Sequence, residues 1–129
     1  MTQTEIAFAN ERAIIANMLI GILTNVRLTY LPDLEPADAD ELLLTGAHVL
    51  MAQLGSQPAT AAEISRVIGR PRDVVLLRLD ELIKRGYVER SGNRYKMTTN
   101  FNVPNLHRHM RSNINMIQAA AKRLGAVHP

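Results

Sequence analysis

Apolar residues recur at spacings of three and four along most of the chain, which is the pattern of amphipathic helices. Near the start, this pattern runs from Thr4 to about Tyr30 and covers about half of a helix circumference. Pro32 and Pro36 disfavour helix in the residues before them. The sequence therefore predicts an N-terminal helix with an unusually wide apolar face, formed by Ile14, Ile15, Met18, Leu19, Ile22, Leu23 and Val26.

Two further helices are predicted from their start signals. Asp38 and Glu41 have the spacing of an N-cap and capping-box pair, and they precede the apolar segment "ELLLTGAHVLMAQL", which runs to Gly55. Thr60 and Glu63 repeat the same spacing before the short segment "AAEISRVI". We expect this short helix to end at the glycine that follows it.

A longer helix over 71–85 and a hairpin over 87–98 come next. Pro71 has the position of a proline at the first turn of a helix. After the helix, "YVER" and "RYKMT" flank the turn "SGN", where Gly92 can supply a positive φ, so a β-hairpin is predicted. A last helix is predicted from Pro104 to about Leu124. One face of the 71–85 helix is apolar, with Val75, Leu76, Leu79, Leu82 and Ile83.

Composition restricts the class of protein. At 129 residues and 47% hydrophobic content, the chain has the size of one domain, 1–129. The first charges are Glu5 and Glu11, which does not fit a signal peptide, and the longest apolar run, 13–23, is too short to cross a bilayer. We therefore expect a cytoplasmic protein with no membrane partner. The absence of cysteine excludes disulfides and thiolate metal sites, and no metal or other cofactor is predicted.

The charges are segregated along the chain. Residues 1–60 contain two basic and seven acidic side chains, for a net charge of −5, whereas residues 61–129 contain thirteen basic and five acidic ones, for +8. Nine of the basic residues lie between Arg66 and Lys96. Such a concentration predicts either a surface for a polyanion such as DNA or a solvated basic face.

The order helix, short helix, tight turn, helix and basic hairpin resembles the winged helix-turn-helix, specifically that of transcription regulators of the MarR family. The resemblance spans about 38–98. It rests on "AAEISRVIG", on "LDELIKRGYVER" and on "GNRYKMT", and on the signature formed by Leu82, Gly86, Tyr87 and Val88. It implies a mainly α fold with a small β-hairpin wing, and a DNA-binding regulator that acts as a homodimer, with the role of a repressor.

In such a fold the 71–85 helix enters the major groove, and the 87–98 wing lies on the backbone or in the minor groove. Leu77 is unusual, because it points opposite the buried Leu79 and places an apolar group where bases are read. It can touch a thymine methyl group, and Arg78 is the best candidate for a guanine. The alternative is a protein-interaction module in which Val74 and Leu77 dock a partner. The predicted DNA-binding residues are Arg70, Arg72, Val74, Leu77, Arg78, Arg90, Asn93, Arg94 and Lys96.

The terminal helices are predicted to form the dimer. The last helix has a heptad seam over three repeats, made of Val103, His107, Met110, Ile114, Ile117, Ala121 and Leu124. A compact monomer is the alternative, but the winged core alone can cover only part of two such helices. The resemblance implies that helices 1–31 and 103–125 interlace between two chains, although this chain has one C-terminal helix where two are usual. The predicted interface residues are Ile15, Met18, Ile22, Met110, Ile114, Ile117 and Leu124.

Ligand binding and catalysis receive less support. The resemblance implies a small aromatic effector in a crevice that Met18, His48, Met51 and Met110 would line, whereas methionines at helical spacing are also typical of a core. His107 and His109 diverge by about 200° on a helix, unlike the i, i+4 pair of a helical metal site. No catalytic motif is present in the sequence, so we do not expect an enzyme.

Overall fold

The computed structural model describes residues 1–99 and 103–127. The chain divides into two compact units, which are described separately. The helical unit contains Met1–Pro32 with Val103–Pro129, and the winged unit contains Asp33–Asn102.

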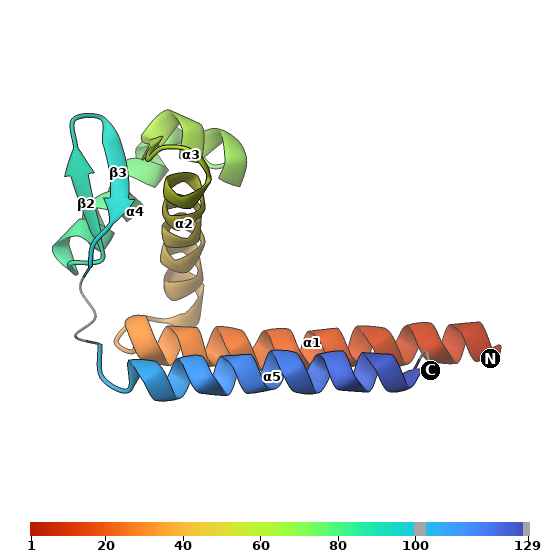
Figure 1. Ribbon diagram of the computed structural model, residues 1–129. Helices are drawn as coiled ribbons and strands as arrows, with labels where there is room; N and C mark the ends of the chain where they lie inside the picture. Colours follow the sequence, from red (N-terminus) through yellow and green to blue (C-terminus); the bar gives the residue numbers. More distant parts are fainter. Residues whose placement is uncertain (100–102, 128–129) are drawn as a thin grey trace. The chain divides into compact units, whose positions relative to one another are not determined.

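The winged unit has three helices and a small sheet (Figure 1). Its elements follow the order α2 (Pro36–Gly55), β1 (Ala59–Thr60), α3 (Ala61–Ile68), α4 (Arg72–Lys84), β2 (Val88–Ser91) and β3 (Arg94–Met97). The three strands are antiparallel in the order β1-β3-β2, so β3 is the central strand. The predicted fold class, mainly helical with a small wing, is confirmed.

Local signals explain where α3 and α4 begin and end. The Thr60 side chain accepts a hydrogen bond of 3.2 Å from the backbone N–H of Glu63, as the capping pattern predicts. Gly69 ends α3 with φ +76°, a left-handed conformation that favours glycine. Pro71 immediately precedes α4, and its fixed φ suits the entry into a helix.

The core of the winged unit lies between α2, α3, α4 and the sheet. Two core positions on α4, Val75 and Leu79, are 1% and 0% exposed, so this face of the helix is fully covered. Full burial of such a side chain stabilises the fold by about 1.5–3 kcal/mol. The other large buried residues of the unit are Leu42, Val49, Ile64, Leu82, Val88 and Tyr95.

The helical unit consists of α1 (Gln3–Tyr30) and α5 (Leu106–Val127). These two helices lie side by side and run in opposite directions (Figure 1). Their antiparallel register follows from the hydrogen bonds that join Asn25 to Asn113 and Thr29 to His109.

Two local predictions were wrong. Asp38 does not cap α2, because Pro36 starts the helix earlier and Glu35 occupies the N-cap without a side-chain hydrogen bond. The last helix does not end near Leu124 but continues through Gly125 to Val127, since a helix tolerates an internal glycine at a modest cost. The predicted hairpin is confirmed by the antiparallel pairing of β2 with β3. The additional strand β1 was not predicted, because its two residues are too few to give a periodic pattern.

Candidate nucleic-acid interface

The outward face of α4 is a stripe of four exposed residues, Asp73, Leu77, Asp80 and Lys84, which we call the α4 stripe. At 100° per residue, these positions fall within about 60° of one another and opposite the buried side of the helix. Leu77 is 69% exposed, in agreement with its predicted outward direction. The α4 stripe is therefore apolar at its centre and acidic on both sides of that centre.

Sequence reasoning missed Asp73 and Asp80. They lie four residues before and three residues after Leu77, so the helical repeat could have identified them. Within the described chain, neither carboxylate has a hydrogen-bonding or ionic partner. Val74 and Arg78, which were predicted to read bases, are half-buried, and Arg78 lies about 100° around the helix from Leu77.

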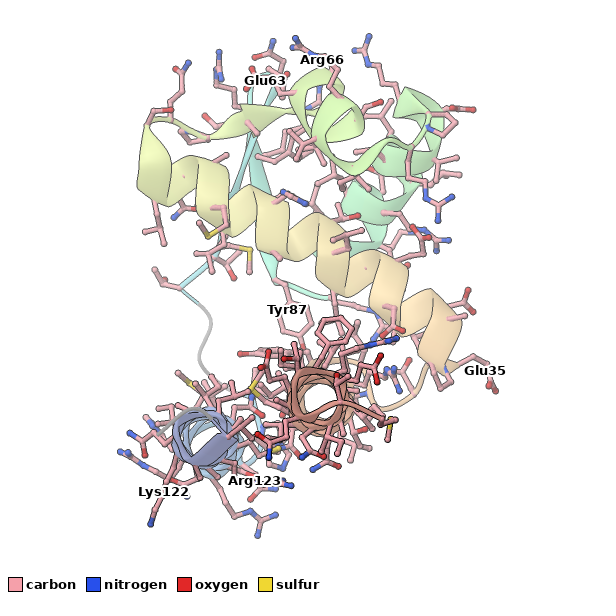
Figure 2. All side chains as sticks on the ribbon, turned by 90° about the vertical axis from the view of Figure 1, so that its right-hand side faces the viewer. Glu35, Glu63, Arg66, Tyr87, Lys122 and Arg123 are labelled. Atoms are coloured by element: carbon pink, nitrogen blue, oxygen red, sulfur yellow. The ribbon has the colours of Figure 1, made fainter. Side chains whose placement is uncertain are left out.

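Basic side chains gather around the turn between α3 and α4. Arg66, which the sequence analysis did not select, is exposed and points outward from α3 (Figure 2). Arg72 is exposed at the first position of α4, and among the described residues neither arginine has an ionic partner. Arg70 differs, because its guanidinium binds Glu41 at 2.5 Å. Two unpaired guanidinium groups near the start of α4 are suited to phosphate binding.

The wing carries basic residues that are partly paired. Arg90 donates from Nε to the backbone oxygen of Gly92 at 2.6 Å, and its guanidinium lies 5.9 Å from the centre of the Tyr95 ring. The Lys96 ammonium lies 3.3 Å from a Glu89 carboxylate oxygen. Both basic side chains are exposed, and exposed ion pairs are worth less than about 1 kcal/mol, so a phosphate can compete for them.

Arg94 has a different environment from the other wing residues. Its Nη1 donates to the backbone oxygen of Pro58 at 2.6 Å and lies 3.5 Å from Oε1 of Glu63. The side chain is about one-third exposed and joins β3 to the segment before α3. Arg94 therefore links the wing to the segment before α3, whereas the turn residue Asn93 is exposed.

The end of α4 is fixed by ionic contacts. Arg85 donates two hydrogen bonds, of 2.9 and 2.8 Å, to the carboxylate of Asp33, and a third, of 2.9 Å, to Glu81. The hydrogen bond from Arg85 lowers the pKa of Asp33 from 3.8 to about 2. Because Asp33 precedes α2, these contacts tie the C-terminal end of α4 to the start of the winged unit.

In the helical unit, α5 contacts α1 through small and polar residues. Asn25 donates to Ser112 and Asn113 at 3.0 and 3.1 Å, and Thr29 is hydrogen-bonded to Nδ1 of His109. Gly21 lies so close to α5 that a Cβ atom there would be 2.5 Å from Sδ of Met116. The α1/α5 contact within the chain therefore combines small and polar residues with a few apolar ones, among them Ile14, Met18 and Met116.

The large apolar residues of these helices lie elsewhere. On α5, Met110, Ile114 and Ile117 are 50%, 38% and 50% exposed and lie about 100° around the helix from the side that faces α1. Leu124, the last residue of the predicted seam, is half-buried. The α1 helix has a comparable stripe about 90° from its contact with α5, made of Phe8, Ile15, Leu19, Ile22 and Val26.

These two apolar stripes lie on the same side of the helical unit. On each helix, the apolar stripe is rotated by about 90–100° from the side that contacts the other helix. In both helices this rotation follows the direction of increasing residue number. Because the two helices are antiparallel, equal rotations in the same sense lead to the same side. The helical unit therefore has one broad apolar face, which contains six of the seven predicted interface residues. The exception is Met18, which faces α5.

The predicted effector residues are not brought together within either unit. Met18 lines a shallow depression of about 100 Å³ between α1 and α5 with Met116 and Arg123. Met110 lies on the broad apolar face, whereas His48 and Met51 belong to α2 in the winged unit. The aromatic effector stays a prediction.

The length and hydropathy of α1 are those of a membrane-spanning helix. Its 28 residues contain an 18-residue window with a mean hydropathy of 1.5, of which 6% is buried. This differs from the expectation from the apolar run 13–23, which by itself is too short to cross a bilayer. The same property is found in core helices of soluble proteins, so it is weak evidence for a membrane. Within the described residues, no group of three or more His, Cys, Asp or Glu side chains could hold a metal ion.

The winged unit, in which α3 is followed by α4 and then by a β-hairpin, has the fold of the winged helix-turn-helix class. Residues 44–103, just under half of the chain, match the model of a family described as "Sugar-specific transcriptional regulator TrmB". TrmB proteins are winged-helix regulators that bind DNA, so the match indicates a transcription regulator and does not support the narrower resemblance to MarR. Comparisons with curated proteins and with solved structures found no match.

Proposed function

We propose that the protein is a sequence-specific DNA-binding transcription regulator that acts as a homodimer in the cytoplasm. In this proposal, α4 enters the major groove and the β2/β3 wing lies on the backbone or in the minor groove. Double-stranded DNA and a second copy of the chain are the partners. The role of repressor rests only on the resemblance of the winged unit to regulators of this fold.

The observation that carries DNA binding is the position of the exposed cations. Arg66 and Arg72 are exposed beside the turn between α3 and α4, and Arg90 and Lys96 are exposed on the wing. Phosphates lie on both sides of the major groove, so cations on both sides of a groove-reading helix match the charge of a duplex. Backbone contacts of this kind position the helix without reading the sequence.

The broad apolar face of the helical unit supports the homodimer. A helix that is apolar on more than one side needs covering on more than one side, and α5 covers only one side of α1. The face is formed by two antiparallel helices, so a second copy can pack on it as the other half of a four-helix arrangement. A lipid surface is the competing occupant and is an outcome of the test in the Discussion.

DNA binding is tested by the salt dependence of affinity. Fluorescence anisotropy would be measured with pooled genomic duplexes at several salt concentrations. Neutralisation of phosphates predicts that the logarithm of the affinity falls linearly with the logarithm of salt concentration, with a slope of about −0.9 for each phosphate contacted. A slope near zero, or no binding at low salt, would contradict the proposal.

A protein-interaction module is the second candidate, and Leu77 is the observation that favours it. Leu77 is 69% exposed at the centre of the outward face of α4, so its apolar side chain is accessible to a partner protein. The Leu77→Ala variant separates the two functions. Loss of a thymine contact weakens binding only to duplexes that carry that thymine, whereas a docking leucine leaves DNA binding unchanged.

A further inference from the structure

We infer that the α4 stripe reads pyrimidines, with Asp73 and Asp80 accepting from cytosine amino groups and Leu77 contacting a thymine methyl between them. The inference rests on the proposed function, because it assumes that α4 lies in the major groove. It names the class of DNA sequence that this surface selects.

The dimensions of the stripe fit a short run of bases. Asp73 and Asp80 are seven residues apart, which is about 10 Å along a helix. Successive bases on one strand are about 3.4 Å apart, so the two carboxylates span about three base steps. Leu77 lies between them and on the same side, within about 60° of both. Three side chains therefore face about four consecutive base pairs.

The chemistry of the three side chains selects among the bases. A carboxylate only accepts hydrogen bonds, and guanine and thymine present acceptors in the major groove, so both repel it. Cytosine presents its N4 amino donor without an adjacent acceptor on the same base. Adenine also has an amino donor, but its N7 acceptor lies beside it and repels a carboxylate. The aspartates therefore favour cytosine, and Leu77 favours the thymine methyl group.

The charges on and near α4 favour base-specific contacts over non-specific attraction to DNA. Two unpaired carboxylates lower the affinity of α4 for any polyanion, whereas Arg66 and Arg72 raise it. A helix that meets DNA with carboxylates at its centre binds well only where those carboxylates find donors. The aspartates thus disfavour incorrect sequences as well as favour correct ones.

The test is selection of duplexes from a random pool by the parent protein and by Asp73→Asn and Asp80→Asn. Asparagine pairs with adenine through its N6 and N7 atoms, so each substitution predicts a change of preference from cytosine to adenine at one position. The two affected positions should lie about three base pairs apart. On the selected duplex, replacing the critical cytosine should weaken the parent by roughly 5- to 100-fold. Both variants should also bind random duplex more tightly than the parent, because each loses a negative charge.

Asp38→Asn is the matched control. Asp38 is an exposed carboxylate in the first turn of α2, so the control removes the same charge from the winged unit without changing α4. It should select the parent's sequence, and circular dichroism would verify that all variants are folded.

The outcomes separate the inference from the proposed function. If both α4 variants select the parent's sequence, or if the parent binds DNA with a steep salt dependence but enriches no sequence, the pyrimidine reading is wrong while DNA binding stands. If the parent binds no duplex at any salt concentration, both are wrong. A change from cytosine to adenine in the variants but not in the control supports the inference.

Discussion

The substitution Ile117→Asp tests whether the broad apolar face joins two chains. Ile117 is 50% exposed and lies in the middle of the α5 stripe, away from the contact with α1. Burial of the exposed half of this side chain would stabilise a dimer by about 1 kcal/mol per chain, or about 2 kcal/mol for two chains. An unpaired carboxylate in an apolar interface adds a further cost of several kcal/mol unless it becomes protonated. We therefore expect at least about 3 kcal/mol, which weakens the dimer about a hundredfold.

Light scattering and sedimentation equilibrium would measure this effect. The parent should have twice the chain mass of 14.4 kDa at micromolar concentration, and Ile117→Asp should move toward the mass of one chain. Asn115→Asp is the matched control, because Asn115 is exposed on the polar side of α5 and the new charge stays in water. The control should remain dimeric.

Three results would refute the reasoning. A parent protein with the mass of one chain would show that no second copy covers the apolar face. Equal masses for the parent and Ile117→Asp would place the interface elsewhere. Co-sedimentation of a monomeric parent with lipid vesicles would identify a membrane as the occupant and would agree with the hydropathy of α1.

Three further predictions concern the winged and helical units. Arg66→Ala should weaken binding to all duplexes alike and reduce the salt slope by about one, which anisotropy would measure. Arg94→Ala should chiefly lower the free energy of unfolding, by about 1 kcal/mol, because its hydrogen bond to a backbone oxygen is lost. Urea unfolding would measure this second effect. In urea unfolding, Gly21→Ala should be less favourable in the parent than in a Met116→Ala background by roughly 0.5 kcal/mol, a small difference because the contacted Sδ lies near the end of a flexible side chain. Equal effects in the two backgrounds would contradict the close approach. Since the folded pKa of Asp33 is lowered to about 2, its contribution to stability is complete above about pH 4 and is lost as the pH falls to 2. The free energy of unfolding should therefore change less over this interval in Asp33→Asn than in the parent. Parallel pH profiles for the two proteins would refute this prediction.

The local elements were predictable from the sequence because their signals are local. The Thr60 cap needs only a hydroxyl and a backbone N–H three residues away, and its hydrogen bond was found. The outward direction of Leu77 follows from the helical repeat, since α4 has a single apolar side that must be buried. The same repeat places Asp73 and Asp80 beside Leu77, although neither was among the predicted site residues.

Only the tertiary structure decided which basic residues are available to a ligand. Arg94 and Arg66 are equivalent in a sequence, since both are arginines in a basic segment. The folded chain brings Pro58 and Glu63 to Arg94 across strand pairings that no local pattern specifies, whereas Arg66 is directed to solvent. Likewise, the heptad seam of α5 predicted an apolar contact but not its partner. Within the chain α5 meets α1 partly through Gly21, Asn25 and Thr29, because small and polar side chains let two helices approach closely and form hydrogen bonds. Periodicity identifies which side of a helix is apolar, but the choice of which surface covers it depends on contacts between residues far apart in the chain.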